Sequence, residues 1–158
     1  MINQKTALNM VIGNPIDHSR SPELHGLLYQ ILHCNAVMMA HASTDLESTM
    51  QALMTLSVRL IAVTMPYKKK IMAYLDEMSD DVKALQSANT VIVRDQKRVG
   101  YNTNVDGIAY ALRDVSLENK NALILGAGGA ASAAAYYCQK QNATLFYRLE
   151  SHAGKNPR

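Results

Sequence analysis

The chain has 158 residues, a net charge of +3 and an ordinary globular composition, with 48% hydrophobic and 18% charged residues. No segment approaches the roughly 20 uninterrupted apolar residues of a membrane-spanning helix, so we expect no membrane partner. The basic run Lys68–Lys70 is short and has no aromatic reader beside it, so we expect no nucleic-acid partner. No signal-type apolar stretch follows the first residues, and we therefore expect a cytoplasmic protein.

Strand-like and helix-like segments alternate along the chain, which predicts an α/β fold. We expect strands at residues 8–12, 37–40, 60–64, 90–94, 99–102, 122–125 and 144–147, the fourth and fifth of these forming a hairpin. We expect helices at residues 23–32, 46–54, 69–78 and 106–115, a short helix from Asp80, and an alanine-rich helix that ends near Cys138.

Some of these segments carry more specific signals. The helix at 23–32 has an apolar stripe at helical spacing, formed by Leu24, Leu27, Leu28, Ile31 and Leu32. Residues Thr44 to Glu47 form a capping-box pattern that opens the helix at 46–54. Cys34 and Cys138 belong to no cysteine pair or cysteine-histidine cluster, so we expect two buried small hydrophobes and no metal site.

The turn at residues 13–22 offers hydroxyl groups to a ligand. Ser19 and Ser21 lie there between Pro15 and Pro22. Because each hydroxyl can both donate and accept a hydrogen bond, the turn suits a polyhydroxylated or carboxylated small molecule.

The turn at residues 126–131 consists of glycine and alanine, so it offers backbone groups rather than polar side chains to a ligand. It follows an apolar strand and precedes a helix, which favours dinucleotide binding over an ordinary tight turn. Arg148 ends the next strand, where an NAD site would have an acidic residue, and an arginine there can pair with the 2′-phosphate of NADP. The predicted cofactor-binding residues are Gly126, Ala127, Gly128, Gly129, Ala130 and Arg148.

Five segments, in this order, resemble the shikimate/quinate dehydrogenase family: Gly13–His25, Val63–Lys68, Asn89–Thr90, Asn102–Gly107 and Gly126–Ala131. The resemblance implies an N-terminal α/β substrate-binding domain with a mainly parallel sheet, followed by the start of a Rossmann NADP-binding domain. We expect the first domain at residues 1–103, a connecting helix and loop at 104–120, and an incomplete Rossmann unit at 121–158.

The resemblance also implies roles for single residues. Ser19 and Ser21 would bind the substrate carboxylate, and Thr64 and Asn89 would contact the ring hydroxyls. Lys68 would be the catalytic acid and base, since a lysine beside the reacting carbonyl can donate a proton during reduction and accept one in reverse.

The chain departs from the family pattern in three ways. Asn104 stands where the family has its catalytic aspartate, and an amide can neither take a proton nor supply a counter-charge to lysine. Ala62 replaces a substrate-binding asparagine, which predicts weaker substrate binding. Family members also continue well beyond the length of this chain, so we expect a C-terminally truncated member.

These observations lead to an NADP-dependent shikimate dehydrogenase, an enzyme of aromatic amino acid biosynthesis that acts on shikimate or 3-dehydroshikimate. The alternative is a noncatalytic, degenerate member that binds a shikimate-like ligand or only a partner protein. A quinate-preferring or NAD-using relative is a third interpretation. The sequence leaves the oligomeric state open.

Overall fold

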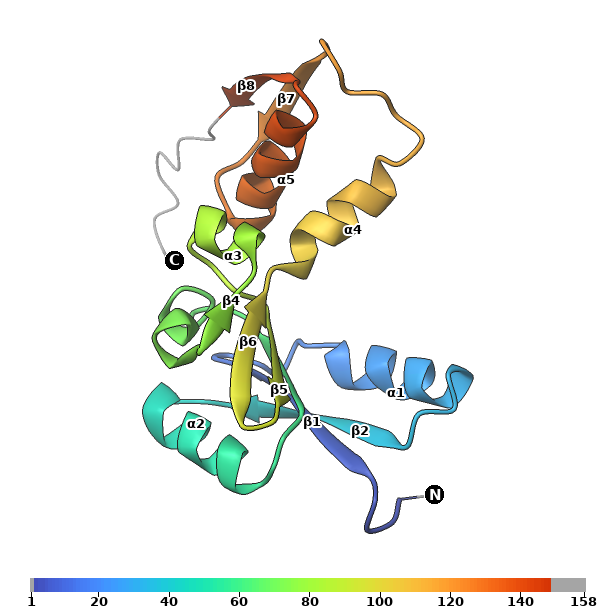
Figure 1. Ribbon diagram of the computed structural model, residues 1–158, viewed down its shortest axis with the longest axis vertical. Helices are drawn as coiled ribbons and strands as arrows, with labels where there is room; N and C mark the ends of the chain where they lie inside the picture. The colour runs from blue at the N-terminus through green and yellow to red at the C-terminus, as the bar shows by residue number, and fades with distance from the viewer. Residues whose placement is uncertain (1, 149–158) are drawn as a thin grey trace, which may run out of the picture. The chain divides into compact units, whose positions relative to one another are not determined.

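The structure, a computed structural model, describes residues 2–148 as an α/β protein (Figure 1). The chain divides into two compact units, residues 1–102 and 103–158. Each unit has its own sheet and its own buried residues, so each is described by itself.

The first unit contains a six-stranded mixed sheet with the strand order β2-β1-β3-β5-β6-β4. Strands β2, β1 and β3 run parallel, β5 is antiparallel to both β3 and β6, and β4 runs parallel to β6. Three of the five pairings are therefore parallel, in agreement with the predicted fold class. The elements are β1 Ala7–Gly13, α1 Ser21–Ile31, β2 Ala36–Ala42, α2 Leu46–Thr55, β3 Leu60–Val63, the 3₁₀ helix η1 Lys70–Tyr74, β4 Glu77–Met78, α3 Asp80–Leu85, β5 Thr90–Arg94 and β6 Lys97–Tyr101.

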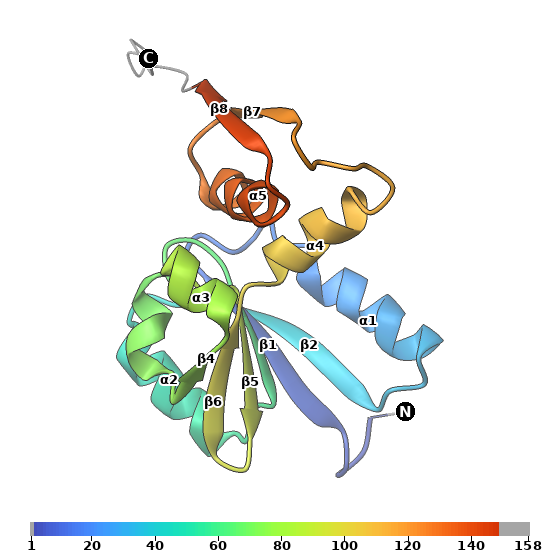
Figure 2. The same cartoon turned by 45° about the horizontal axis from the view of Figure 1, so that its top comes forward.

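Helices α1 and α2 lie on opposite faces of this sheet, as Figure 2 shows. Because side chains alternate between the faces of a strand, Ile12 and Ile61 point toward α2 while their neighbours Val11 and Ala62 point toward α1. The face toward α2 holds the larger core, formed by Ile12, Leu46, Met50, Leu53, Val58, Ile61, Val63, Tyr67, Ile71, Val82, Ala88 and Val91.

The predicted apolar stripe of α1 does not enter a core. Leu27 is 56% exposed and Ile31 is 62% exposed, and α1 contains no buried residue. The helix contacts the sheet side through Tyr29, which packs against Val11, Ile16 and Met38. Helical periodicity identifies an apolar face, but it does not say whether anything covers that face.

The structure also corrects the predicted helix at 69–78. Its first part is only the short 3₁₀ helix η1, and the rest is the strand β4, which pairs with β6. Asp76, between these two elements, binds the backbone and side chain of Arg98 on β6. A strand pairing with residues about 20 positions away therefore overrides the local helical pattern.

Three smaller predictions were also inaccurate. The N-cap of α2 is Asp45 rather than Thr44, because the Asp45 carboxylate accepts hydrogen bonds from the amides of Glu47 and Ser48. The helix expected at 106–115 is α4, Thr103–Ala111, which begins three residues earlier. Cys34 is exposed, and only Cys138 is buried.

The second unit contains α4, β7 (Asn121–Leu125), α5 (Gly129–Lys140) and β8 (Thr144–Arg148). Strands β7 and β8 pair in parallel through the crossover helix α5, which buries Ala133, Ala135 and Cys138. The chain therefore forms a strand-helix-strand unit of the kind that the glycine-rich turn predicted. Within residues 2–148, no helix has the length and apolar character needed to cross a membrane.

Candidate active site

The predicted substrate residues lie along one edge of the six-stranded sheet. Ser19 and Ser21 follow the end of β1, and Thr64 and Lys68 follow the end of β3. Asn89 comes directly before β5, but β5 is antiparallel to β3, so its beginning lies beside the end of β3. The fold therefore brings five residues from three separate segments to one edge, where ligands of parallel α/β sheets bind.

Backbone hydrogen bonds join the segments that carry these side chains. The Thr64 amide donates to the Ile12 carbonyl at 2.9 Å, and the Asn14 amide donates to the Met65 carbonyl at 3.0 Å. On the other side, the Val63 amide donates to the Asn89 carbonyl at 2.8 Å. The segments after β1, after β3 and before β5 thus form one connected framework.

The two serines occupy the entrance to α1. Ser21 is the first residue of the helix, and its amide donates to the Ser19 hydroxyl at 3.4 Å. Both serines are half-buried. The arginine between them forms an ion pair with Glu23 at 2.8 Å, with 85% of the Arg20 side chain exposed. Because helix N-termini favour negative charge, hydroxyls at this point suit a carboxylate.

A polar chain connects α1 to the sheet. The Asn9 side-chain amide on β1 donates to the Tyr29 hydroxyl at 2.7 Å, and that oxygen lies 3.3 Å from Nδ1 of His25. Asn9 is buried, and partial burial lowers the pKa of His25. Since α1 has no buried residue, these side-chain hydrogen bonds and the packing of Tyr29 help to hold the helix, with Ser21 at its start, against the sheet.

Lys68 is half-buried, and its backbone is held in place. Its carbonyl accepts a hydrogen bond from the Ala88 amide at 2.8 Å. Among the described residues of the first unit, no carboxylate forms an ion pair with Lys68. Asn104 belongs to the second unit, where it is the second residue of α4.

Asn102 supports the same edge, although it was not among the predicted site residues. Its side-chain amide nitrogen donates to the Ser87 carbonyl at 2.8 Å, directly before Ala88 and Asn89. The side chain is 5% exposed, and its Oδ1 atom has no hydrogen-bond partner among residues 2–148. In the sequence, Asn102 stands out only as the first residue of the segment Asn102–Gly107. The burial of a polar residue before a helix cannot be predicted from the sequence.

The glycine-rich turn of the second unit has the geometry of an anion-binding backbone. Gly126 adopts a φ of +106°, which L side chains rarely adopt. Gly128 is the N-cap of α5, and a Cβ atom at Gly128 or Gly129 would meet nothing within 4 Å. The start of α5 is therefore open to an incoming phosphate.

Arg148 lies beside this turn, at the end of β8. The Gly126 amide donates to the Arg148 carbonyl at 3.1 Å, and the Arg148 residue is exposed. An open helix N-terminus with an arginine at the end of the adjacent strand fits the pyrophosphate and the 2′-phosphate of NADP. Ala127 and Ala130 complete the turn and are exposed.

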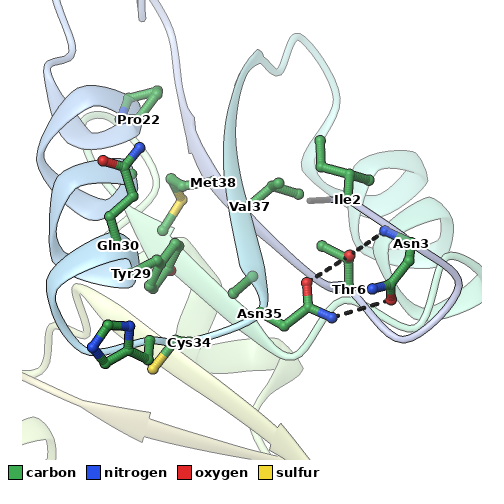
Figure 3. Close-up of a pocket in the computed structure, with 13 residues that line it drawn as sticks. Ile2, Asn3, Thr6, Pro22, Tyr29, Gln30, Cys34, Asn35, Val37 and Met38 are labelled. Carbon is green, nitrogen blue, oxygen red and sulfur yellow. Dashed lines mark hydrogen bonds between the residues drawn. The ribbon is translucent and has the colours of Figure 1, made fainter.

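A pocket of about 720 Å³ opens elsewhere in the first unit, between α1 and the start of β2 (Figure 3). It contains none of the predicted site residues and lies where β1 and β2 begin rather than where they end. Its polar side chains Asn3, Thr6 and Asn35 bind one another. Among residues 2–148, no group of three His, Cys, Asp or Glu side chains could hold a metal ion.

The chain is similar to several known proteins in sequence and in fold. The chain is 39% identical to the shikimate dehydrogenase (NADP(+)) of Pyrococcus furiosus over 142 residues, which cover 89% of this chain and 52% of the relative. The crystal structure of shikimate dehydrogenase from Aquifex aeolicus superposes with a TM-score of 0.89 at 34% identity, covering 97% of this chain and 59% of that one.

Shikimate 5-dehydrogenase from Listeria monocytogenes, solved in complex with shikimate and NAD, superposes with a TM-score of 0.85 at 29% identity, covering 96% of this chain and 55% of that one. The chain spans about half the length of the curated relatives that it matches. The family model described as the shikimate dehydrogenase substrate binding domain matches residues 11–91, which contain all five polar residues of the sheet edge. The chain belongs to the shikimate dehydrogenase family.

Proposed function

We propose that the chain is an NADP-dependent oxidoreductase of the shikimate dehydrogenase type, which interconverts 3-dehydroshikimate and shikimate. The observation that carries this proposal is the gathering of Ser19, Ser21, Thr64, Lys68 and Asn89 at one sheet edge. This set offers hydroxyl, amide and ammonium groups to a small polyhydroxylated acid. The names of the curated relatives support the same substrate and cofactor.

Each side chain has a distinct task in this proposal. Ser19 and Ser21 bind the substrate carboxylate at the start of α1, and Thr64 and Asn89 bind ring hydroxyls. Lys68 donates a proton to the carbonyl oxygen of 3-dehydroshikimate as that carbonyl becomes an alcohol. In the reverse direction the neutral Lys68 amine accepts the hydroxyl proton of shikimate.

The glycine-rich turn and Arg148 would hold the cofactor. Its reduced form, NADPH, would supply the hydride for reduction, and its oxidised form, NADP+, would accept the hydride during oxidation. The amides at the start of α5 are suited to the pyrophosphate, and the Arg148 guanidinium is suited to the 2′-phosphate. The absence of an acidic residue at the end of β8 favours NADP over NAD.

A second candidate function is binding without turnover, and Asn104 is the observation that favours it. The amide of Asn104 can hydrogen-bond a substrate hydroxyl but cannot exchange a proton with it. Loss of one partner of an acid and base pair lowers turnover by a factor of about 100 to 10,000. Such a protein would bind a shikimate-like ligand at the same sheet edge without oxidising it.

The test combines turnover with binding. Absorbance at the reduced-cofactor band is followed with shikimate and NADP for the wild-type chain, for Asn104→Asp and for the control Asp106→Asn, which changes an exposed carboxylate in the same helix turn. We expect turnover to rise about 100-fold or more in Asn104→Asp and to stay unchanged in the control.

Calorimetric titration with shikimate separates the two functions. Shikimate binding with turnover in Asn104→Asp supports the enzyme, and binding without turnover in any variant supports the noncatalytic protein. An absence of shikimate binding in both the wild-type chain and Asn104→Asp would overturn both functions.

A further inference from the structure

Tyr67 is the buried residue of the segment that carries Lys68. Its side chain is 5% exposed and belongs to the core beneath α2, whereas Met65, Pro66, Lys69 and Lys70 are exposed. Tyr67 is therefore the only buried residue between residues 64 and 70. Because a buried hydroxyl without a partner is costly, the position of its hydrogen-bond acceptor constrains the ring.

That acceptor is the backbone of Ser43, on a different loop. The Tyr67 hydroxyl donates to the Ser43 carbonyl at 2.6 Å. Ser43 follows β2 directly and is fully buried, and its amide donates to the Gly13 carbonyl at 3.0 Å. The Tyr67 side chain thus binds the segment after β3 to the segment after β2, which is itself bound to the end of β1.

Ser43 is also fixed from the side of α2. Its hydroxyl lies 2.9 Å from the Thr49 hydroxyl, which donates to the Asp45 carbonyl at 2.7 Å. Asp45 is the N-cap of α2. The acceptor of Tyr67 therefore belongs to a rigid part of the fold rather than to a loop that could follow the tyrosine.

We propose that Tyr67 is a positioning residue for Lys68, acting through the hydrogen bond from its hydroxyl to the Ser43 carbonyl. The role of Lys68 rests on the proposed function. Two consecutive residues hold this backbone: the Tyr67 hydroxyl donates to the Ser43 carbonyl, and the Lys68 carbonyl accepts from the Ala88 amide at 2.8 Å. A lysine side chain has many rotamers, so its amine reaches a substrate reproducibly only from a fixed backbone.

The hydroxyl, and not merely the ring, performs this task. The ring fills a volume in the core, whereas the hydrogen bond of the hydroxyl fixes the position of the far end of the ring relative to Ser43. A phenylalanine at position 67 would keep the packing and release the link to Ser43. The segment would then keep its backbone hydrogen bonds, among them the bond from the Ala88 amide to the Lys68 carbonyl, but would lose the side-chain link to Ser43.

Two variants separate positioning from stability. Tyr67→Phe removes the hydrogen bond to Ser43, and the matched control Thr49→Val removes a buried hydroxyl of the same network without touching the segment at 64–68. Amide hydrogen exchange is measured for both variants at Ala88, whose amide donates to the Lys68 carbonyl. Calorimetric titration with shikimate is carried out on both variants as well. Urea unfolding gives the loss of global stability for each variant.

We expect exchange at Ala88 to accelerate about tenfold in Tyr67→Phe beyond the change in global stability, and to follow global stability alone in Thr49→Val. We expect the shikimate dissociation constant to rise about tenfold in Tyr67→Phe only. Equal exchange in the two variants, or unchanged shikimate affinity in Tyr67→Phe while the wild type binds, would overturn the proposal. Faster exchange at Ala88 in a protein that binds no shikimate would support the positioning of the Lys68 backbone and contradict the proposed function instead.

Discussion

Gly13 and Thr64 meet at the edge of the six-stranded sheet with no space for a side chain between them. A Cβ atom on Gly13 would collide with the Cγ2 atom of Thr64 and would approach the Met65 carbonyl oxygen to 3.0 Å. Gly13 ends β1, and Thr64 directly follows β3. The close approach of these two strand ends therefore sets the position of a proposed substrate-binding threonine.

Gly13→Ala should displace Thr64 and weaken shikimate binding. Overpacking at a tightly contacted position typically costs about 1–3 kcal/mol of folding free energy, and the neighbouring backbone must move. Calorimetric titration and urea unfolding would measure the two effects. The matched control is Gly26→Ala, since a Cβ atom there meets nothing within 4 Å and alanine favours the interior of α1. The control should be more stable by about 0.5–1 kcal/mol, and a Gly13→Ala protein with unchanged affinity would contradict the steric argument.

The exposed leucines of α1 should contribute little to stability. Leu27 is 56% exposed, so Leu27→Gln should change the free energy of unfolding by about 0.5 kcal/mol or less. Leu53 of α2 is 2% exposed, and Leu53→Ala should cost about 2–5 kcal/mol. Urea unfolding of both variants measures this contrast. If Leu27→Gln lowered the free energy of unfolding as much as Leu53→Ala, α1 would have to bury its leucines in the folded protein.

The α1 stripe also illustrates how far the sequence predicts the fold. The sequence predicted the helix and its apolar face correctly, because both follow from local spacing. It could not predict the exposure of that face, which depends on what packs nearby. The strand β4 was missed for a related reason, since its partner β6 lies about 20 residues further along the chain.

At the candidate site, the sequence pointed to the segments but not to the hydrogen bonds that join them. The serine turn, Lys68 and Asn89 were recognised as elements of a family pattern. The hydrogen bond from Tyr67 to Ser43 joins residues 24 positions apart, and no spacing rule predicts such a pair. Asp45 caps α2 for a similarly geometric reason, because its carboxylate reaches the amides of Glu47 and Ser48, whereas the capping-box pattern made Thr44 the N-cap.

The two cysteines should differ sharply in reactivity. Cys34 is exposed, whereas Cys138 is buried in α5 and burial raises the pKa of its thiol. Since the thiolate is the reactive form, a thiol-specific chromogenic reagent should label one cysteine quickly in the folded protein and the second only after denaturation. Cys34→Ser should remove the fast phase, and Cys138→Ser should leave it intact. Two fast phases in the wild type would contradict the burial of Cys138.

Asp76 and Arg98 hold the short strand β4 against β6. The Asp76 carboxylate accepts hydrogen bonds from the Arg98 amide at 2.7 Å, from Nε at 2.8 Å and from Nη2 at 2.7 Å. These bonds and the guanidinium charge hold the pKa of Asp76 well below its ordinary value of 3.8. The bidentate geometry distinguishes this pair from the single contact between Lys97 on β6 and Glu77 on β4.

The lowered pKa of Asp76 predicts how stability depends on pH. At a pH between the folded and unfolded pKa values of Asp76, this carboxyl group is protonated in the unfolded state but not in the folded state. Its contribution to the free energy of unfolding is therefore complete above about pH 4 and is lost as the pH falls further. Asp76→Asn should therefore be less stable than the wild type in urea unfolding at pH 7. This gap, the difference in free energy of unfolding between the two proteins, should narrow steadily below pH 4. Glu77→Gln, which removes only the single contact to Lys97, should show a smaller gap at pH 7. A gap for Asp76→Asn that stays constant between pH 7 and pH 3 would show that the carboxylate charge does not stabilise the attachment of β4.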